Sequence, residues 1–257
     1  LALLGYFKYT GFFVANLNAL AGTLIPMPDI TLPLAISFFT FQQIAYLVDV
    51  KRGEAQDYSF MHYCLFVTFF PQLVAGPIVH HKEMMPQFSH VGSRNAISEN
   101  LQVGITIIIL GLFKKVVLAD NLALMSDPIF ARAEAGETLG FTEAWVAVSA
   151  FTGQIYFDFS GYSDIAIGSA RLFGIRFPEN FNWPYLARSP REFWNNWHIS
   201  LSSWIRDYLY MPMIGQRPHT QSTGGLSVAV EEENRGLKPS TALFVTWFIM
   251  GLWHGAA

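Results

Sequence analysis

Charged residues are scarce in this chain. Asp, Glu, Lys and Arg supply only 14% of the 257 residues, while hydrophobic residues supply 52%. Soluble domains carry about 25% charged residues, so the deficit indicates a membrane protein surrounded by the lipid bilayer. The formal net charge of −3 gives no excess of basic residues, and we therefore expect no nucleic-acid partner.

Cysteine and the common catalytic motifs are scarce as well. The one cysteine, Cys64, cannot form a disulfide within the chain or a cysteine-rich metal site. The sequence has no GxSxG elbow, no P-loop and no GxGxxG. His254 has no acidic residue within four positions and no second histidine at metal-ligand spacing. We therefore predict no metal and no tightly bound cofactor.

Long apolar stretches fill most of the chain. A transmembrane helix needs about 20 mostly apolar residues. Six stretches reach or approach this length: 1–25, 33–50, 60–79, 105–118, 143–173 and 241–257. They predict an all-α polytopic membrane protein. The first and last are cut within apolar sequence, so we expect residues 1–257 to be a single membrane domain truncated at both ends.

Two interruptions of this pattern are informative. Pro71 and Pro77 fall within the third apolar stretch and predict a broken helix near a cavity. The segment 215–240 is polar and acidic, and it is the most loop-like connection of the chain.

Polar residues also occur inside the stretch YFDFSGYSDIAIGSARLFG, residues 156–174. On a helix, spacings of 4, 4 and 3 place four of them on one face: Ser160, Asp164, Gly168 and Arg171. Gly161 and Gly168 would let other helices approach closely. Charges at membrane depth usually face protein or a water-filled cavity. This face therefore predicts either a structural polar seam between helices or the wall of a substrate path.

A second polar segment is REFWNNWHISLSSWIRDYLYMP, residues 191–212. Its spacing predicts one helix over 191–208 with a single polar stripe formed by Asn195, His198, Ser202 and Arg206. Tryptophans, Trp197 among them, fill much of the remaining surface, which favours a position at the headgroup level or at the edge of a cavity. By residue type alone, His198 is either a structural histidine or part of a site.

The sequence GLWHGAA, residues 251–257, places a histidine inside an apolar run. Gly251 and Gly255 flank Trp253 and His254 and would leave room for a ligand beside the imidazole. Because imidazole titrates near neutral pH, His254 is a suitable base for deprotonating a hydroxyl.

Five stretches, in this order, resemble the membrane-bound O-acyltransferase family, in particular its bacterial branch of alginate O-acetyltransferases and D-alanyl transfer proteins. They are SFFTFQQIAYLVDVKRG (37–53), FFPQLVAGPI (69–78), YFDFSGYSDIAIGSARLFGIRFPENFNWPY (156–185), EFWNNWHISLSSWIRDYLYMP (192–212) and GLWHGA (251–256). Together they extend through nearly the whole chain.

The resemblance implies a fold and a site. The fold is a ring of tilted transmembrane helices around a central tunnel, of which this chain would form a part. His254, in the WHG motif, would be the catalytic histidine, and His198, in the WHISLS motif, the second marker position. The residues expected to support the tunnel are Asn195, Ser202, Arg206, Asp164, Trp197 and Trp253. Asn195 and Asn196 depart from the basic residues that many relatives carry before the WHISLS histidine.

The resemblance also implies an activity. We expect a multi-pass O-acyltransferase of the bacterial inner membrane that transfers an acetyl group from a cytoplasmic thioester, acetyl-CoA or an acyl-carrier protein. The acceptor would be the hydroxyls of an extracytoplasmic polysaccharide such as alginate, and the partner a periplasmic polysaccharide acetyltransferase. D-alanyl transfer to teichoic acid, a non-enzymatic transporter and a scaffold subunit of an export complex are the alternatives.

Overall fold

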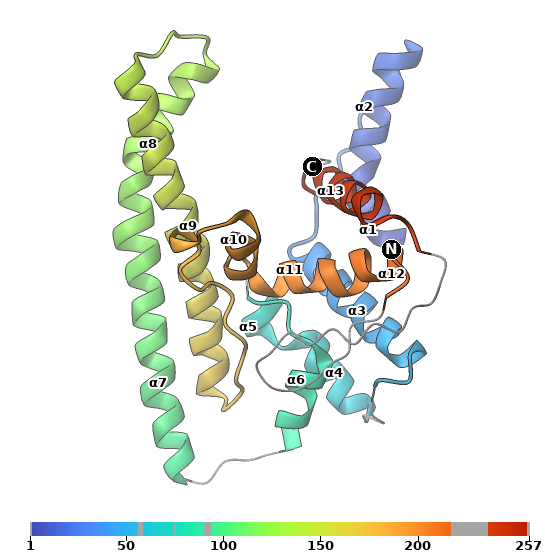
Figure 1. The fold of residues 1–257 in the computed structure, drawn as a ribbon, viewed down its shortest axis with the longest axis vertical. Helices are drawn as coiled ribbons and strands as arrows, with labels where there is room; N and C mark the ends of the chain where they lie inside the picture. Colours follow the sequence, from blue (N-terminus) through green and yellow to red (C-terminus); the bar gives the residue numbers. More distant parts are fainter. Residues whose placement is uncertain (1, 56–58, 74–75, 90–93, 217–235, 256–257) are drawn as a thin grey trace. The chain divides into compact units, whose positions relative to one another are not determined.

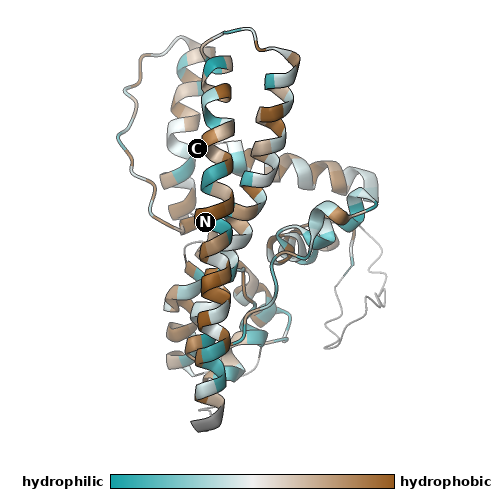
Figure 2. Cartoon of the chain, turned by 90° about the vertical axis from the view of Figure 1, so that its left-hand side faces the viewer, coloured by the Kyte–Doolittle hydropathy of each residue, from teal (hydrophilic) through white to brown (hydrophobic). Residues whose placement is uncertain are grey.

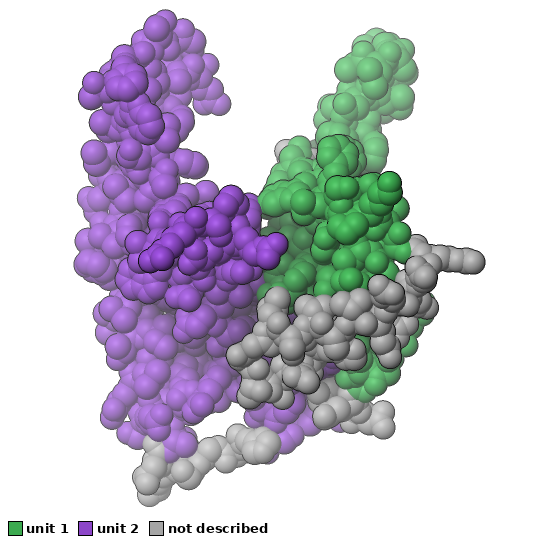
Figure 3. Space-filling view, in the orientation of Figure 1, with its two compact units in different colours: residues 1–56, 201–257 green, residues 57–200 purple. Residues whose placement is uncertain are grey.

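The computed structural model describes residues 2–55, 59–73, 76–89, 94–216 and 236–255. All regular secondary structure in these residues is helical, which confirms the all-α prediction for this part of the chain (Figure 1). Most of the polar segment 215–240 lies outside the described residues. The chain forms two compact units, one of residues 1–56 and 201–257 and one of residues 57–200 (Figure 3).

The second unit is built on a long helical hairpin. A continuous rod runs through α7 (Arg94–Leu112), the π-helix η3 (Phe113–Ala119) and α8 (Asp120–Glu134), and α9 (Phe141–Leu172) returns beside it (Figure 1). Hydrophobic residues (brown) are interspersed with hydrophilic ones (teal) along these helices (Figure 2). Several large hydrophobic side chains of α7 are exposed, among them Leu101, Ile105, Ile109 and Leu110.

Glycines bring α7 and α9 into close contact. A Cβ at Gly104 would lie 2.8 Å from the carbonyl oxygen of Gly168, and one at Gly168 would lie 2.7 Å from that of Gly104. Gly111 and Gly161 face each other in the same way, with corresponding distances of 2.7 and 2.8 Å. Only glycine allows this approach, which is a common way for helices to associate in membranes. The prediction that Gly161 and Gly168 admit neighbouring helices is thus confirmed.

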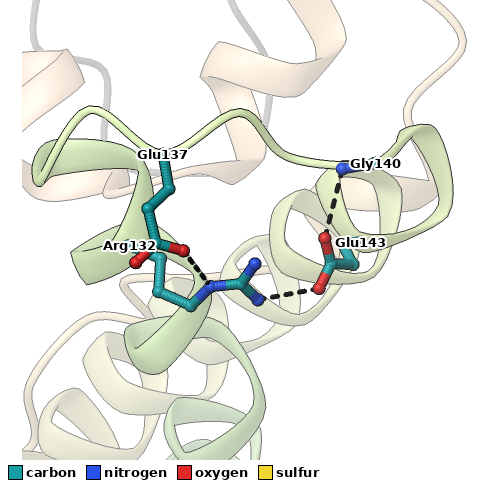
Figure 4. A network of polar contacts seen from close by, with 4 residues as sticks. All are labelled: Arg132, Glu137, Gly140 and Glu143. Carbon is teal, nitrogen blue, oxygen red and sulfur yellow. Dashed lines mark hydrogen bonds and ion pairs between the residues drawn. The ribbon is translucent and has the colours of Figure 1, made fainter.

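Polar contacts close the turn between α8 and α9 (Figure 4). Arg132 donates to Glu137 and to Glu143, each at 2.8 Å. The other carboxylate oxygen of Glu143 accepts the N–H of Gly140 at 3.1 Å, which satisfies a main-chain donor at the start of α9. These contacts place a polar cluster at the turn of the hairpin.

The remaining helices of the second unit are short. The predicted break in the third apolar stretch is present, because the chain leaves the helical conformation at Phe69, two residues before Pro71. Pro71 has no N–H with which to continue the ladder. The short elements are α4 (Phe60–Thr68), α5 (Phe70–Leu73), α6 (His81–Met84), η2 (Met85–Ser89), η4 (Pro184–Leu186), α10 (Pro190–Asn196) and the first part of α11 (Ile199–Ile205).

The first unit is organised around aromatic side chains. Phe41 lies between two tryptophans, with ring-centroid distances of 4.5 Å to Trp204 and 5.2 Å to Trp253, and Trp204 stacks on Tyr208 at 5.6 Å. The indole N–H of Trp204 also donates to the carbonyl oxygen of Phe41 at 3.0 Å. The helices of this unit are α1 (Ala2–Leu4), η1 (Gly5–Tyr9), α2 (Thr10–Ala21), α3 (Ile36–Lys51), η5 (Arg206–Tyr210), α12 (Met211–Met213) and α13 (Pro239–Gly255).

One helix among the described residues is long and apolar enough to cross a membrane by itself. It runs from Ala96 to Glu134 and has a window of mean hydropathy 2.0, of which 11% is buried. Its 39 residues extend to about 58 Å, well beyond the roughly 30 Å hydrocarbon core. Helices also occupy the other five stretches predicted as membrane segments.

Candidate functional site

The segment around His198 is not the continuous helix that its spacing predicted. α10 ends at Asn196, Trp197 is extended with φ −103° and ψ 124°, and α11 begins at Ile199. His198 itself has φ 42°, in the left-handed region. The prediction of one polar stripe over 191–208 is therefore wrong. A non-glycine residue in the left-handed region, such as His198, persists only where neighbouring groups hold its main chain, and it often marks a functional site.

Main-chain contacts from the loop that follows α9 explain the break. The carbonyl oxygen of Asn180 accepts the N–H of Ile199 at 2.9 Å, and the N–H of Asn182 donates to the carbonyl oxygen of Asn196 at 2.9 Å. These bonds occupy groups that a continuous helix would pair within itself. The loop therefore takes main-chain bonds that the helix would need, and the helix is interrupted at Trp197 and His198.

Asn180 is the centre of the polar contacts around His198. Its side chain is 1% exposed, and its Oδ1 lies 3.1 Å from Nδ1 of His198. The same oxygen accepts the N–H of Ser200 at 3.2 Å and the hydroxyl of Ser200 at 2.9 Å. The amide nitrogen of Asn180 donates to the hydroxyl of Ser163, on α9, at 3.0 Å. One buried amide thus connects α9 with the WHISLS motif.

Aromatic rings enclose the imidazole of His198. Phe159 meets it edge-on at a centroid distance of 4.7 Å and an interplanar angle of 89°. Phe181 lies nearly parallel to it, at 6.3 Å and 23°. His198 is 6% exposed, so its ring has a defined orientation inside the second unit.

The other residues predicted for the polar stripe, and Trp197 among those predicted to support the tunnel, have different surroundings. Asn195 is exposed on α10, and Ser202 is half-buried on α11. The guanidinium of Arg206 makes two contacts with the carboxylate of the adjacent Asp207, at 2.6 and 3.1 Å. Trp197 stacks on Phe193 at 5.7 Å with an angle of 14°. Because the helix is interrupted between Asn196 and Ile199, Asn195 does not share one continuous helix with Ser202 and Arg206.

Asp164 takes part in ion pairs between helices. Its carboxylate lies 2.6 Å from Nζ of Lys114, while Lys115 contacts Asp158 at 2.5 Å and Asp120 at 2.9 Å. The π-helix η3 carries both lysines, and its wider turn directs two consecutive side chains toward partners. Arg171, which the sequence placed on the same helix face as Asp164, pairs with Glu99 of α7 at 3.4 Å. Of the two interpretations of this face, these ion pairs favour the structural polar seam between helices over the wall of a substrate path.

His254 lies on the last turn of α13 and is exposed. The ring of Trp253 is 4.2 Å from it between centroids, and Nζ of Lys8 is 4.8 Å from the centroid of Trp253. A Cβ built at Gly251 or Gly255 would meet no atom within 4 Å, which agrees with the room predicted beside the imidazole.

A cavity of about 410 Å³ opens beside this turn within the first unit. Its wall is mostly apolar and includes Lys8, Phe12, Met27 and Gly255. The indole Nε1 of Trp253 is buried and has no hydrogen-bond partner among the residues that the structure describes. Within the same residues, no group of three His, Cys, Asp or Glu side chains could hold a metal ion.

The two histidines belong to different compact units. Asn195, Trp197, His198 and Asp164 lie in the second unit, and Ser202, Arg206, Trp253 and His254 lie in the first. Sequence reasoning did not identify Asn180, because it lies in an irregular loop without periodicity. The only signal was its position within the third resembling stretch, between α9 and the WHISLS motif.

The chain belongs to the membrane-bound O-acyltransferase family, whose sequence model matches residues 50–229. The match includes His198 and Asn180 and ends before His254. It agrees with the all-helical structure, and membership makes this a membrane protein.

Three relatives illustrate the similarity. The chain is 41% identical over 280 residues to the "Peptidoglycan O-acetyltransferase" of Helicobacter pylori, which covers 99% of this chain and 50% of that protein. It is 42% identical over 261 residues to the "Probable alginate O-acetylase AlgI" of Pseudomonas aeruginosa, covering 100% of this chain and 46% of that protein. Identity to the "Teichoic acid D-alanyltransferase" of Streptococcus thermophilus is 27% over 223 residues, or 86% of this chain and 52% of that protein. The chain thus spans about half the length of the curated relatives that it matches.

Proposed function

We propose that the protein is a membrane O-acyltransferase that transfers an acetyl group from a thioester to a polysaccharide hydroxyl. One observation carries the proposal: His254 is exposed between two glycines with open space beside them, in a chain of the O-acyltransferase family. This arrangement is what a base that must reach an acceptor hydroxyl requires.

In the proposed reaction, His254 accepts the proton of the acceptor hydroxyl as its oxygen attacks the thioester carbonyl. The new C–O bond forms, the C–S bond breaks, and the departing sulfur takes up a proton. A neutral alcohol is a poor nucleophile, so general-base assistance would accelerate the step by about 10² to 10⁴. Relay of the acyl group through a covalent intermediate is the other possible route.

The membrane location follows from the separation of the two substrates. We propose a multi-pass protein of the bacterial inner membrane in which a ring of tilted helices surrounds a tunnel. A cytoplasmic donor, acetyl-CoA or an acyl-carrier protein, and an extracytoplasmic acceptor could meet there without transport of the whole donor. A periplasmic polysaccharide acetyltransferase would be the partner that completes the modification.

Similarity favours acetyl over D-alanyl transfer. Identity is 41–42% to relatives named as O-acetyltransferase or O-acetylase and 27% to a relative named as a D-alanyltransferase. We therefore propose acetyl as the group and a polysaccharide such as alginate or peptidoglycan as the acceptor. Family membership favours an enzyme over a transporter or a scaffold subunit.

The first prediction tests the role of His254. Replacement His254→Ala in the complete protein should abolish acetylation of the polymer in cells while the membrane level of the protein stays normal, because the base is lost. The measurement is polymer-bound acetate per membrane-inserted protein. The matched control is His62→Ala, since His62 packs against Phe88 in the second unit and has no part in the proposed site. Normal acetylation by the His254 variant would remove the assignment.

A further inference from the structure

Asn180 has a defined amide orientation. The main-chain N–H of Ser200 can only donate, so the atom of Asn180 that faces it at 3.2 Å must be the acceptor Oδ1. The hydroxyl of Ser200 accepts the N–H of Ile78 at 2.9 Å, which directs its own proton to the same oxygen. A flipped amide would place two donors against each other at Ser200, and the flip is therefore excluded.

This orientation determines the tautomer of His198. Nδ1 of His198 faces Oδ1 of Asn180 at 3.1 Å, and an oxygen that only accepts requires a proton on Nδ1. In a neutral imidazole the lone pair then lies on Nε2. Neutral His198 can therefore accept a hydrogen bond at Nε2 but cannot donate one there.

The surroundings prevent the ring from exchanging its two nitrogens. Phe159 and Phe181 contact the ring from perpendicular and parallel directions, and the left-handed main chain of His198 is held by the bond between Ile199 and Asn180. A 180° turn of the ring would also lose the contact to Asn180.

We propose that Asn180 is the positioning residue of His198 and sets its tautomer in the acyl-transfer reaction, with the proton on Nδ1 and the lone pair on Nε2. The inference rests on the proposed acyl transfer. The tautomer separates two roles that His198 could have, orienting a hydrogen-bond donor and stabilising a carbonyl oxyanion. A neutral imidazole with its proton on Nδ1 can orient an O–H or N–H group through Nε2, but it cannot stabilise an oxyanion there.

Two replacements test the proposal in the complete protein with its native partner. Asn180→Leu removes the acceptor, and kcat per folded protein should fall about 10- to 100-fold, by analogy with the loss of a group that orients a metal-ligating histidine. Asn180→Asp keeps an acceptor toward Nδ1, while the hydroxyl of Ser163 can rotate to donate to it. This variant should retain activity, but its carboxylate favours the imidazolium, so the acidic limb of the pH–rate profile should move about one unit or more to higher pH. The matched control Asn182→Asp makes the same change in the same loop at an exposed side chain and should leave the profile in place.

The outcomes separate this inference from the proposed function. An Asn180→Asp profile identical to that of the wild type, or a wild-type kcat for folded Asn180→Leu, would show that Asn180 is only structural. If Asn180→Leu does not fold, the profile of the Asp variant decides alone. Full activity of His198→Ala would overturn the inference without affecting His254. Full activity of His254→Ala would instead overturn the proposed function.

Discussion

Individual buried polar side chains in this chain are satisfied by partners distant in sequence. Asp49 is 2% exposed and accepts the hydroxyl proton of Tyr208, 159 positions away, at 2.9 Å, while Arg52 approaches its other oxygen at 3.9 Å. Burial, with the neighbouring Asp49 carboxylate, raises the pKa of the Tyr208 phenol. Tyr208 therefore remains a donor under all physiological conditions.

Removing that donor should destabilise the first unit. Tyr208→Phe keeps the ring that stacks on Trp204 but takes from a buried carboxylate one of its hydrogen bonds. The expected cost is roughly 1.5–3 kcal/mol, as for other bonds to charged groups. Thermal unfolding of the purified protein in detergent measures it. In the double variant with Asp49→Asn much of this cost should disappear, and a Tyr208→Phe protein as stable as the wild type would contradict the assignment.

At the scale of single residues, the sequence predicted the open space beside His254 better than it predicted the partners of buried polar side chains. His254 is exposed between two open glycines as expected from its residue types. Asn180 could not be found, because its role depends on a loop that meets the WHISLS motif only in three dimensions. Asp164 was noted as a charge in an apolar stretch, yet its pairing with Lys114 across 50 positions is a property of the hairpin.

At the scale of elements, α7 and α9 approach each other closely at paired glycines. Gly161→Ala should destabilise this hairpin by about 1–3 kcal/mol, because the new Cβ would lie 2.8 Å from the carbonyl oxygen of Gly111 and the main chains must move apart. Circular dichroism melting in detergent measures the change. Gly5→Ala is the matched control, since no atom lies within 4 Å of its Cβ position. Equal melting temperatures for the two variants would contradict the close packing.

The presence of helices was predictable where hydrophobicity determines it, but their ends were not. The apolar stretch 105–118 lies inside the longer rod from Arg94 to Glu134, and the stretch 143–173 ends one residue beyond α9. Both are helical because lipid leaves the main chain no other way to satisfy its polar groups. The stretch 191–208 has an equally regular polar spacing. Its helix breaks because Asn180 and Asn182 take main-chain bonds at both sides of His198. The spacing of polar residues along the sequence gives no sign of these main-chain bonds from the loop.

At the scale of the whole molecule, family membership and surface composition both indicate that the protein lies in a lipid bilayer. The rod from Ala96 to Glu134 buries little of its most apolar part and exposes large hydrophobic side chains along α7. In water such a surface would aggregate. In a bilayer, lipid or further apolar helices can cover this surface, so the rod does not need other parts of the chain to cover it.

The apolar surface of α7 leads to a final prediction. Ile109 is 59% exposed, and Ile109→Arg should reduce recovery of the protein in the membrane fraction, because an arginine near the helix centre costs about 2.5–3.5 kcal/mol on insertion. Ala135→Arg introduces the same side chain at the exposed polar turn after α8, where a cation also complements the helix C-terminus, and should be recovered normally. Quantitative membrane fractionation of both variants makes the comparison. Equal recovery would mean that Ile109 faces water, and the rod from Ala96 to Glu134 would then not cross the bilayer in this orientation.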